Sequence, residues 1–272
     1  MDFIYRWFLK PNFHFTFLLL WQSHFQAAQS FTNFIFGDSL VDVGNNNYIF
    51  TLSKADSSPY GIDFGPSNGQ PTGRFTNGRT ISDIVDTEAN SIFNGINYAS
   101  GAAGILEDTG ILFIGRVPLR EQVSYFEKSR DYMIEVIGEN GTKEMLKKAM
   151  FTITIGLETL RTLNTELRSG DHNTTFVYAN SYDLFLELVL NYRQFGLENA
   201  DKPCCGGYFP PFTCFKGPNQ NSSQAACEDR SKFVFWDTYH PTEAANLIVA
   251  KALLDGDQTV ATPFNIRYLN DL

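Results

Sequence analysis

The sequence predicts an α/β fold built around a parallel sheet, and two observations carry the prediction. Short apolar runs alternate along the chain with segments of helical period, which is the pattern of consecutive βαβ units. Ser39 follows directly after the first apolar run, at the strand end where α/β sheets gather reacting groups. The 272 residues are 43% hydrophobic and 19% charged, which suffices for one sizeable core. We expect a single domain over residues 31–272.

Residues 1–30 have the pattern of a secretory signal peptide. Arg6 and Lys10 precede the apolar run FHFTFLLLW, and the small residues Ala28 and Ser30 suit a cleavage point. The apolar run is too short to span a bilayer. We therefore expect a secreted, extracellular protein without a transmembrane segment; the alternative is a buried N-terminal helix.

Four short apolar runs are the expected strands, at residues 33–36, 96–99, 151–155 and 175–178. Apolar side chains at helical spacing predict helices between and after them. The expected helical faces are Leu119, Val123, Phe126, Met133 and Ile137; Leu157, Leu160, Leu163 and Leu167; and Tyr182, Phe185, Leu188, Val189 and Tyr192. The last helix is expected to begin at Pro241, because a proline suits the first turn.

The charge balance excludes one class of partner. The net charge is −9 and the pI is near 4.9, so the chain offers no basic surface to a phosphate backbone. We do not expect a nucleic-acid partner, and the composition does not indicate an oligomeric state.

All four cysteines lie in one loop rich in glycine and proline: Cys204, Cys205, Cys214 and Cys227. Such a loop in an exported protein is expected to be tied by disulfides. Four cysteines allow three pairings, and the sequence does not choose between them. A zinc site is the alternative, but the spacing has no CxxC pair and the loop holds no histidine, so we expect no metal.

Three N-glycosylation acceptors lie in stretches expected to be loops. They are Asn140 in NGT, Asn173 in NTT and Asn221 in NSS. Each motif also arises by chance, so the three are expectations that depend on export.

Serine, histidine and aspartate are the parts of a nucleophilic hydrolase. Ser39 lies in FIFGDSLVDVGNNNY, and Asp237 and His240 lie three residues apart in FVFWDTYHPTEAAN. The other histidine beyond residue 30, His172, lies in the polar turn SGDHNTT. A DxxH pair alone is more often a capped helix start, but Ser39 at a strand end favours a catalytic set.

Gly101, in SGAAG, follows an apolar run, and a glycine lets a backbone N–H approach a substrate oxygen. The alternative is a simple turn glycine. Asp38 is expected to brace the turn that carries Ser39 or to cap it.

These motifs resemble the plant GDSL esterase/lipase family of the SGNH hydrolase superfamily. The matching stretches are FGDSLVDVGNNNY, GRFTNGR, INYASGAAGIL and FVFWDTYHPTEAAN. The resemblance implies a flavodoxin-like three-layer α/β/α sandwich. It also implies hydrolysis of carboxylic esters of lipids or acylated small molecules through an acyl-enzyme, without a cofactor. Ser39 would be the nucleophile, His240 the base and Asp237 its orienting carboxylate, with the N–H groups of Ser39 and Gly101 facing the oxyanion.

The chain departs from the family in its third motif. Glu158, in ITIGLETL, stands where the family has an asparagine that donates to the oxyanion, although its side chain could instead face solvent from a helix. The stretch before residue 175 is also shorter than in the family, so we expect one strand–helix unit to be missing. The alternative function is therefore a catalytically impaired relative that acts as a binding protein or is a non-functional shortened product.

Overall fold

The computed structural model describes residues 32–88, 93–155, 175–206, 214 and 225–270. Its centre is a three-stranded sheet in the order β2-β1-β3. The strands are β1 (Thr32–Gly37), β2 (Phe93–Asn97) and β3 (Met150–Thr154). Both neighbours run parallel to β1, which confirms the predicted α/β fold with a parallel sheet.

Side chains of β1 alternate between two layers of helices. Phe34 and Phe36 pack with Tyr98 against α3 (Leu119–Lys147), where Phe126 contacts all three rings. Asn33 faces the other way and donates to Asp86 of α2 (Ile81–Glu88) at 2.6 Å. Because neighbouring side chains of a strand point to opposite faces, this alternation places β1 between the two layers.

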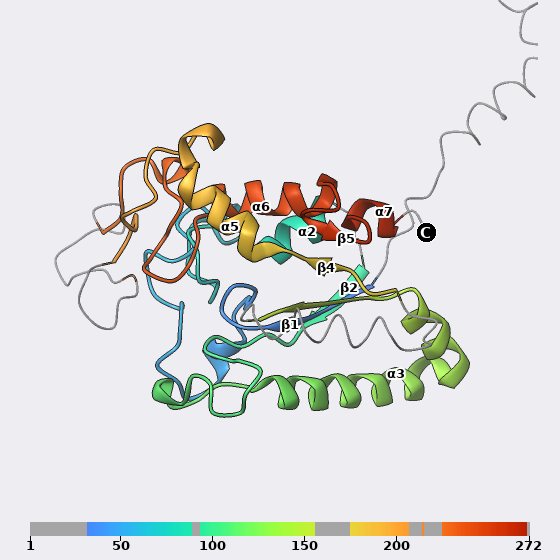
Figure 1. Cartoon of the computed structure of the whole chain (residues 1–272). Helices are drawn as coiled ribbons and strands as arrows, with labels where there is room; N and C mark the ends of the chain where they lie inside the picture. The colour runs from blue at the N-terminus through green and yellow to red at the C-terminus, as the bar shows by residue number, and fades with distance from the viewer. Residues whose placement is uncertain (1–31, 89–92, 156–174, 207–213, 215–224, 271–272) are drawn as a thin grey trace, which may run out of the picture.

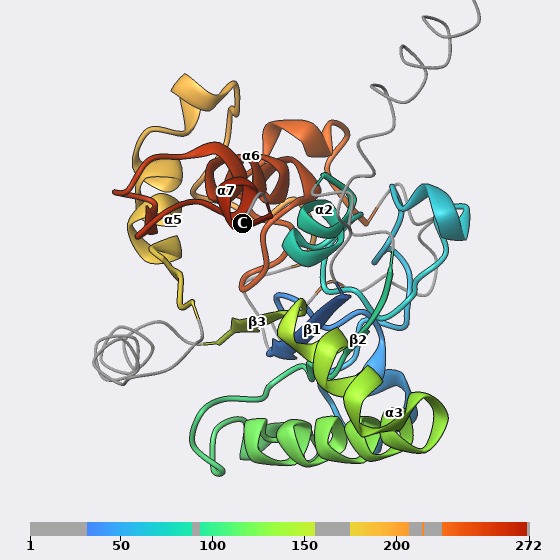
Figure 2. The ribbon, with the colours of Figure 1, turned by 90° about the vertical axis from the view of Figure 1, so that its right-hand side faces the viewer.

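The second layer consists of α2, α5 (Ser181–Leu190) and α6 (Glu243–Asp255), followed by the short α7 (Ile266–Asn270). Figures 1 and 2 show α3 on one side of the sheet and these helices on the other. Their buried cluster includes Ile84, Leu188, Val234, Val249 and Leu254. The result is the three-layer arrangement expected from the family resemblance.

The run at residues 175–178 does not join the parallel sheet. Its ordered part is β4 (Tyr178–Ala179), which pairs antiparallel with β5 (Ala261–Thr262). The backbone N–H of Asn180 continues this pairing with the Val260 carbonyl at 2.7 Å. The assignment of this run to the parallel sheet was therefore wrong, because its backbone groups are matched by a C-terminal segment.

Two helical expectations differ in detail from the structure. In α3, Val123 and Ile137 are exposed although Leu119, Phe126 and Met133 pack on the sheet, and the helix is interrupted at Gly138 with φ 76°. The helix expected to begin at Pro241 is α6, which begins at Glu243 because the Thr242 side chain accepts from the Ala245 N–H and caps it. It is not the last helix, since α7 follows.

The expected α5 face is mostly confirmed. Leu188 is buried, and Phe185, Val189 and Tyr192 pack against the same cluster, whereas Tyr182 is exposed. The leucine face at residues 157–167 lies outside the described residues.

The cysteines form two disulfides, which confirms the expectation and selects one pairing. Cys204 is bonded to Cys227 and Cys205 to Cys214, with Cα–Cα distances of 4.9 and 5.2 Å. They lie in a buried cluster with Tyr60, Phe75 and Trp236.

Asn140 does not lie in a loop. It is an exposed residue of α3, and the threonine of its motif, Thr142, is buried. The loop expectation for Asn140 was wrong because the helix resumes after the break at Gly138. Asn173 and Asn221 lie outside the described residues. Within the described ranges, no helix is long and apolar enough to cross a membrane.

Candidate active site

The turn that presents Ser39 is built by close backbone contact between β1 and β3. A Cβ atom on Gly37 would lie 2.1 Å from the Thr154 carbonyl oxygen, so glycine is required there. The Asp38 N–H donates to the same carbonyl at 3.1 Å, and the Asp38 carboxylate accepts from the Leu40 N–H at 2.9 Å. Asp38 thus braces the turn, and Ser39 projects from the carboxyl end of β1.

Gln122 of α3 clamps the same turn from the other side. Its side chain is buried, accepts from the Gly37 N–H at 2.9 Å and donates to the carbonyls of Gly37 and Val117 at 2.9 Å each. No sequence pattern predicts this role, because Gln122 lies 85 residues from Gly37.

Ser39, His240 and Asp237 form one hydrogen-bonded series. Ser39 Oγ lies 2.8 Å from His240 Nε2, and His240 Nδ1 lies 2.8 and 2.9 Å from the two carboxylate oxygens of Asp237. His240 is 5% exposed and Asp237 is fully buried. The structure therefore brings these three predicted residues together across 201 positions of sequence.

The Asp237 carboxylate is held by its own loop as well as by the histidine. The backbone N–H groups of Tyr239 and His240 donate to Oδ1 at 2.8 and 2.9 Å, and the Tyr60 hydroxyl donates to Oδ2 at 2.6 Å. Burial alone would raise the pKa of Asp237, but His240 and these donors lower it below its usual value. The carboxylate is therefore held ionised beside the imidazole.

The loop from Trp236 to Pro241 explains the DxxH spacing. The Trp236 N–H donates to the His240 carbonyl at 2.8 Å, so the chain folds back on itself and brings Asp237 under the ring. The Trp236 carbonyl accepts from the Cys205 N–H at 2.7 Å, which ties the loop to the disulfide-bonded segment.

The carboxylate of Asp38, next to Ser39, is destabilised in its ionised form. Burial raises the pKa of Asp38 to about 6, against the opposing effects of the Leu40 N–H and of His240. Asp38 therefore carries a charge that the surrounding protein disfavours near neutral pH.

Gly101, whose N–H the family resemblance assigns to the oxyanion, already has a hydrogen-bond acceptor for that group in the structure. Its N–H donates to Asp42 Oδ2 at 2.8 Å and so is directed into the protein. A Cβ atom there would lie 2.7 Å from the Phe75 ring and 2.8 Å from Ser53 Oγ. Gly101 is thus a glycine because the site is crowded, and the next residue, Ala102, takes a left-handed φ of 69°.

Asn46 joins the loop after β1 to the loop after β2. Its amide donates to the carbonyls of Ser53 and Gly101 at 2.8 and 2.9 Å, and its oxygen accepts from Ser100 Oγ at 2.6 Å. The asparagine run of the first motif contains this residue, but sequence alone does not show its partner 55 positions away.

Two residues considered for the active site in the sequence, Glu158 and His172, lie outside the described residues. Within the described part of the chain, no cluster of His, Cys, Asp and Glu side chains could hold a metal ion.

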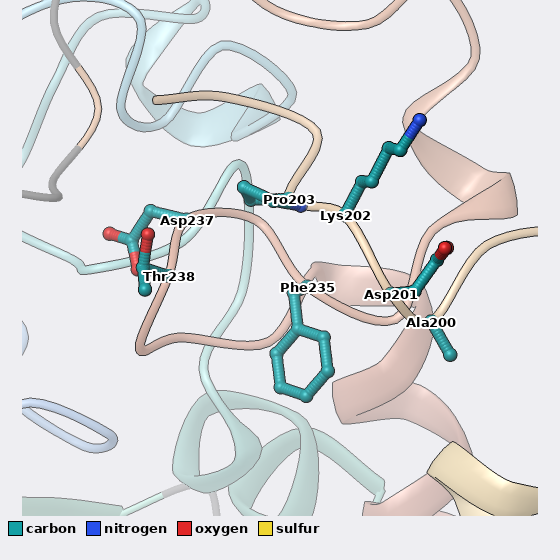
Figure 3. A pocket seen from close by; sticks show the side chains of 7 residues that line it. All are labelled: Ala200, Asp201, Lys202, Pro203, Phe235, Asp237 and Thr238. Carbon is teal, nitrogen blue, oxygen red and sulfur yellow. The ribbon is translucent and has the colours of Figure 1, made fainter. Parts of the chain in front are cut away.

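A depression of about 280 Å³ is lined in part by the Asp237 loop (Figure 3). Its lining residues are Ala200, Asp201, Lys202, Pro203, Phe235, Asp237 and Thr238. Figure 3 shows the Lys202 side chain directed away from Asp237. Neither Ser39 nor His240 lines this depression, so we do not place the substrate's reacting group in it.

A three-layer α/β fold with a serine, a histidine and an aspartate hydrogen-bonded in series at the carboxyl end of its sheet has the architecture of a serine hydrolase. No protein-family model matches the chain. It is 63% identical to GDSL esterase/lipase At5g41890 of Arabidopsis thaliana over 355 aligned positions, which cover 92% of this chain and 96% of the relative.

Two further Arabidopsis thaliana proteins are similar over most of their length. GDSL esterase/lipase At3g50400 is 34% identical, covering 88% of this chain and 91% of the relative. GDSL esterase/lipase At2g23540 is 35% identical, covering 88% of both. The chain belongs to the GDSL esterase/lipase family.

The chain is a shortened member of this family. The alignment with At5g41890 runs over 355 positions whereas this chain has 272 residues, so the relative contains sequence without a counterpart here. That the absent part is one strand–helix unit before residue 175 stays a prediction.

Proposed function

We propose that this protein is a secreted serine hydrolase that cleaves carboxylic esters through an acyl-enzyme on Ser39. The observation that carries the proposal is the unbroken series from Ser39 Oγ through His240 to Asp237, with each step at 2.8 to 2.9 Å. The family names of the relatives, esterase/lipase, support ester bonds as the target.

The geometry suits each proton transfer of the reaction. His240 Nε2 takes the Ser39 proton while Oγ forms a bond to the ester carbonyl carbon, and the carbonyl oxygen becomes an oxyanion. His240 then gives that proton to the leaving alcohol as the ester C–O bond breaks. A water molecule repeats the sequence on the acyl-enzyme, releasing the acid and restoring Ser39. Asp237 holds the Nδ1 proton and stabilises the imidazolium at each stage.

We assign the oxyanion donors to the N–H groups of Ser39 and Ala102. Neither N–H donates to another group among the described residues, whereas the Gly101 N–H is bonded to Asp42. Backbone N–H groups that are free to donate to a substrate are the groups that stabilise a developing oxyanion. The left-handed φ of Ala102 supports this assignment, because unusual backbone geometry concentrates at functional sites.

Two loops, at residues 48–52 and 111–113, favour substrates with apolar acyl groups. They are hydrogen-bonded to each other through the Leu52 N–H and the Phe113 carbonyl at 2.9 Å. Both expose large apolar side chains, with Tyr48 91%, Phe50 84% and Leu112 87% exposed. Exposed apolar groups of this size are typical of surfaces that meet an apolar ligand.

Secretion is supported by the N-terminal sequence and by the disulfides. Residues 1–30 have the charge and hydropathy order of a signal peptide. Two disulfides are typical of proteins that fold in an oxidising compartment.

The experiment that tests the function is labelling of the purified, secreted protein with a fluorophosphonate, followed by hydrolysis of p-nitrophenyl esters of increasing chain length. We expect labelling of wild type and none of Ser39→Ala, with unchanged circular dichroism. We also expect kcat/KM to rise with acyl length. Equal labelling of both proteins would refute the assignment of Ser39.

The second candidate is a catalytically impaired relative, and the shortened sequence favours it. At the edge of the described sheet, Phe151 and Ile153 of β3 are exposed, and an uncovered edge lowers stability and invites association. Folded, monodisperse protein that fails to react with the fluorophosphonate would support this candidate.

A further inference from the structure

Tyr60 contacts the catalytic set from outside the four matching stretches quoted above. It is 1% exposed, and its hydroxyl lies 2.6 Å from Asp237 Oδ2, 177 residues away. An ionised carboxylate can only accept, so the tyrosine is the donor. Oδ1 is already occupied by two backbone N–H groups, and Tyr60 thus completes the shell around the second oxygen.

We propose that Tyr60 is a positioning residue that fixes the Asp237 carboxylate against His240 and tunes the basicity of the imidazole. This inference rests on the proposed function. A donor on Oδ2 withdraws negative charge from the carboxylate, so the imidazolium of His240 is stabilised less than it would be by a free carboxylate. The same bond prevents the carboxylate from rotating away from Nδ1.

The surroundings of Tyr60 keep its hydroxyl in place and protonated. Its ring packs edge-on against Phe75 and Trp236, with ring centroids 6.1 and 6.3 Å away. The hydroxyl oxygen accepts from the Cys214 N–H at 3.3 Å. Burial and the neighbouring Asp237 raise the pKa of Tyr60 well above its usual value, so it remains a donor throughout the working range.

The Cys205–Cys214 disulfide anchors this arrangement at both ends. Cys214 supplies the N–H that orients the Tyr60 hydroxyl, and the Cys205 N–H donates to the carbonyl of Trp236, the residue before Asp237. The bridge therefore fixes the donor and its acceptor relative to each other. This gives the cysteine loop a specific task beyond general stabilisation.

Few titratable groups surround His240 and Asp237. His240 is faced by Asp237, by Asp38 from the β1 turn, and by the neighbouring Tyr239, while the Phe75 ring lies 5.0 Å from the imidazole. Asp237 is faced by His240 and Tyr60. Removal of the Tyr60 hydroxyl leaves the other charges unchanged.

The test is a histidine NMR titration of full-length protein, which measures the pKa of His240 whether or not the enzyme turns over. The variants are Tyr60→Phe and, as the matched control, Tyr98→Phe, a buried tyrosine packed against Phe36 and Phe126 on the α3 side. Resonances are assigned by comparison with His240→Gln.

For Tyr60→Phe we expect the pKa of His240 to rise by about half a pH unit or more, because the carboxylate regains full charge. The pH at which kcat/KM falls on the acid side should rise by the same amount. In addition, kcat should fall roughly ten- to hundred-fold with little change in KM. Tyr98→Phe should change neither the pKa of His240 nor the pH dependence of kcat/KM. A lower melting temperature for Tyr60→Phe with an unchanged His240 pKa would overturn the inference, since simple packing predicts that result.

A second substitution covers the case in which Tyr60→Phe does not fold. Site-specific 3-fluorotyrosine at position 60 keeps the ring and makes the hydroxyl a stronger donor, so the pKa of His240 should fall. A pKa that rises or stays constant would contradict the proposal. An inactive wild-type protein that still shows these shifts would refute the proposed function but support the positioning role.

Discussion

Replacement of Asp237 by asparagine tests the electrostatic core of the site with almost no change of shape. Oδ1 accepts two backbone N–H groups, so the asparagine oxygen should take that place and its NH2 group should face Tyr60 and His240 Nδ1. The imidazolium then loses its anionic partner. Two charges about 4 Å apart at an effective dielectric of about 20 interact by roughly 4 kcal/mol, which corresponds to about a thousand-fold in rate.

The NH2 group adds a second defect, because it competes with the Nδ1 proton and favours the wrong tautomer, for which losses of about ten-thousand-fold in kcat are known in serine protease triads. We therefore expect the rate constant of fluorophosphonate labelling to fall between about a thousand- and ten-thousand-fold. Asp229→Asn is the control, because that exposed carboxylate caps the Arg230–Lys232 turn and has the same charge. A loss below about tenfold for Asp237→Asn would refute the electrostatic account.

Two further substitutions probe the turn that carries Ser39. Asp38 has a pKa raised to about 6, so between the ordinary value of 3.8 and about 6 the folded state binds more protons than the unfolded state. Its ionisation therefore lowers stability as pH rises through this window. Asp38→Asn should raise Tm at pH 7 and flatten this pH dependence in calorimetry. It should also move the acid-side fall of kcat/KM to lower pH, because it removes a negative charge near His240. A pH 7 Tm below that of wild type would contradict this. Gln122→Leu leaves the buried Gly37 N–H without its acceptor and the Val117 carbonyl without its Gln122 donor, while the Gly37 carbonyl keeps the Ser100 N–H at 3.1 Å. Urea unfolding should therefore show a loss of about 2 to 5 kcal/mol together with slower labelling. A loss no larger than that of the same change at exposed Gln258 would show that the clamp is dispensable.

The parts of the site predicted from sequence were those defined by local pattern. An apolar run, a glycine and a serine define a strand end, and an aspartate three residues before a histidine and a proline defines a tight loop. Both patterns lie within about ten residues, where spacing determines geometry. The structure accordingly places Ser39, Asp237 and His240 together.

The parts that sequence did not predict depend on partners far along the chain. The Gly101 N–H was expected to face the oxyanion, but a carboxylate 59 residues away accepts it. Tyr60 and Gln122 gave no signal, since a buried tyrosine or glutamine acquires its role from partners that only the fold supplies. The run at residues 175–178 has the composition of a strand, but composition does not specify a pairing partner, and β5 takes that place.

The shortened chain bears unequally on stability and on chemistry. The described hydrogen bonds of the catalytic set come from the β1 turn, from Tyr60 and from the Asp237 loop, and the disulfide-bonded segment anchors the last two. From β3, the described contact with this turn is the Thr154 carbonyl that receives the Asp38 N–H. If the absent sequence follows β3, as predicted, its loss exposes Phe151 and Ile153 at the sheet edge while the series from Ser39 to Asp237 remains closed. Reduced stability with an activated serine is therefore the combination that this structure favours, because the contacts that define the site and those at the sheet edge are largely separate.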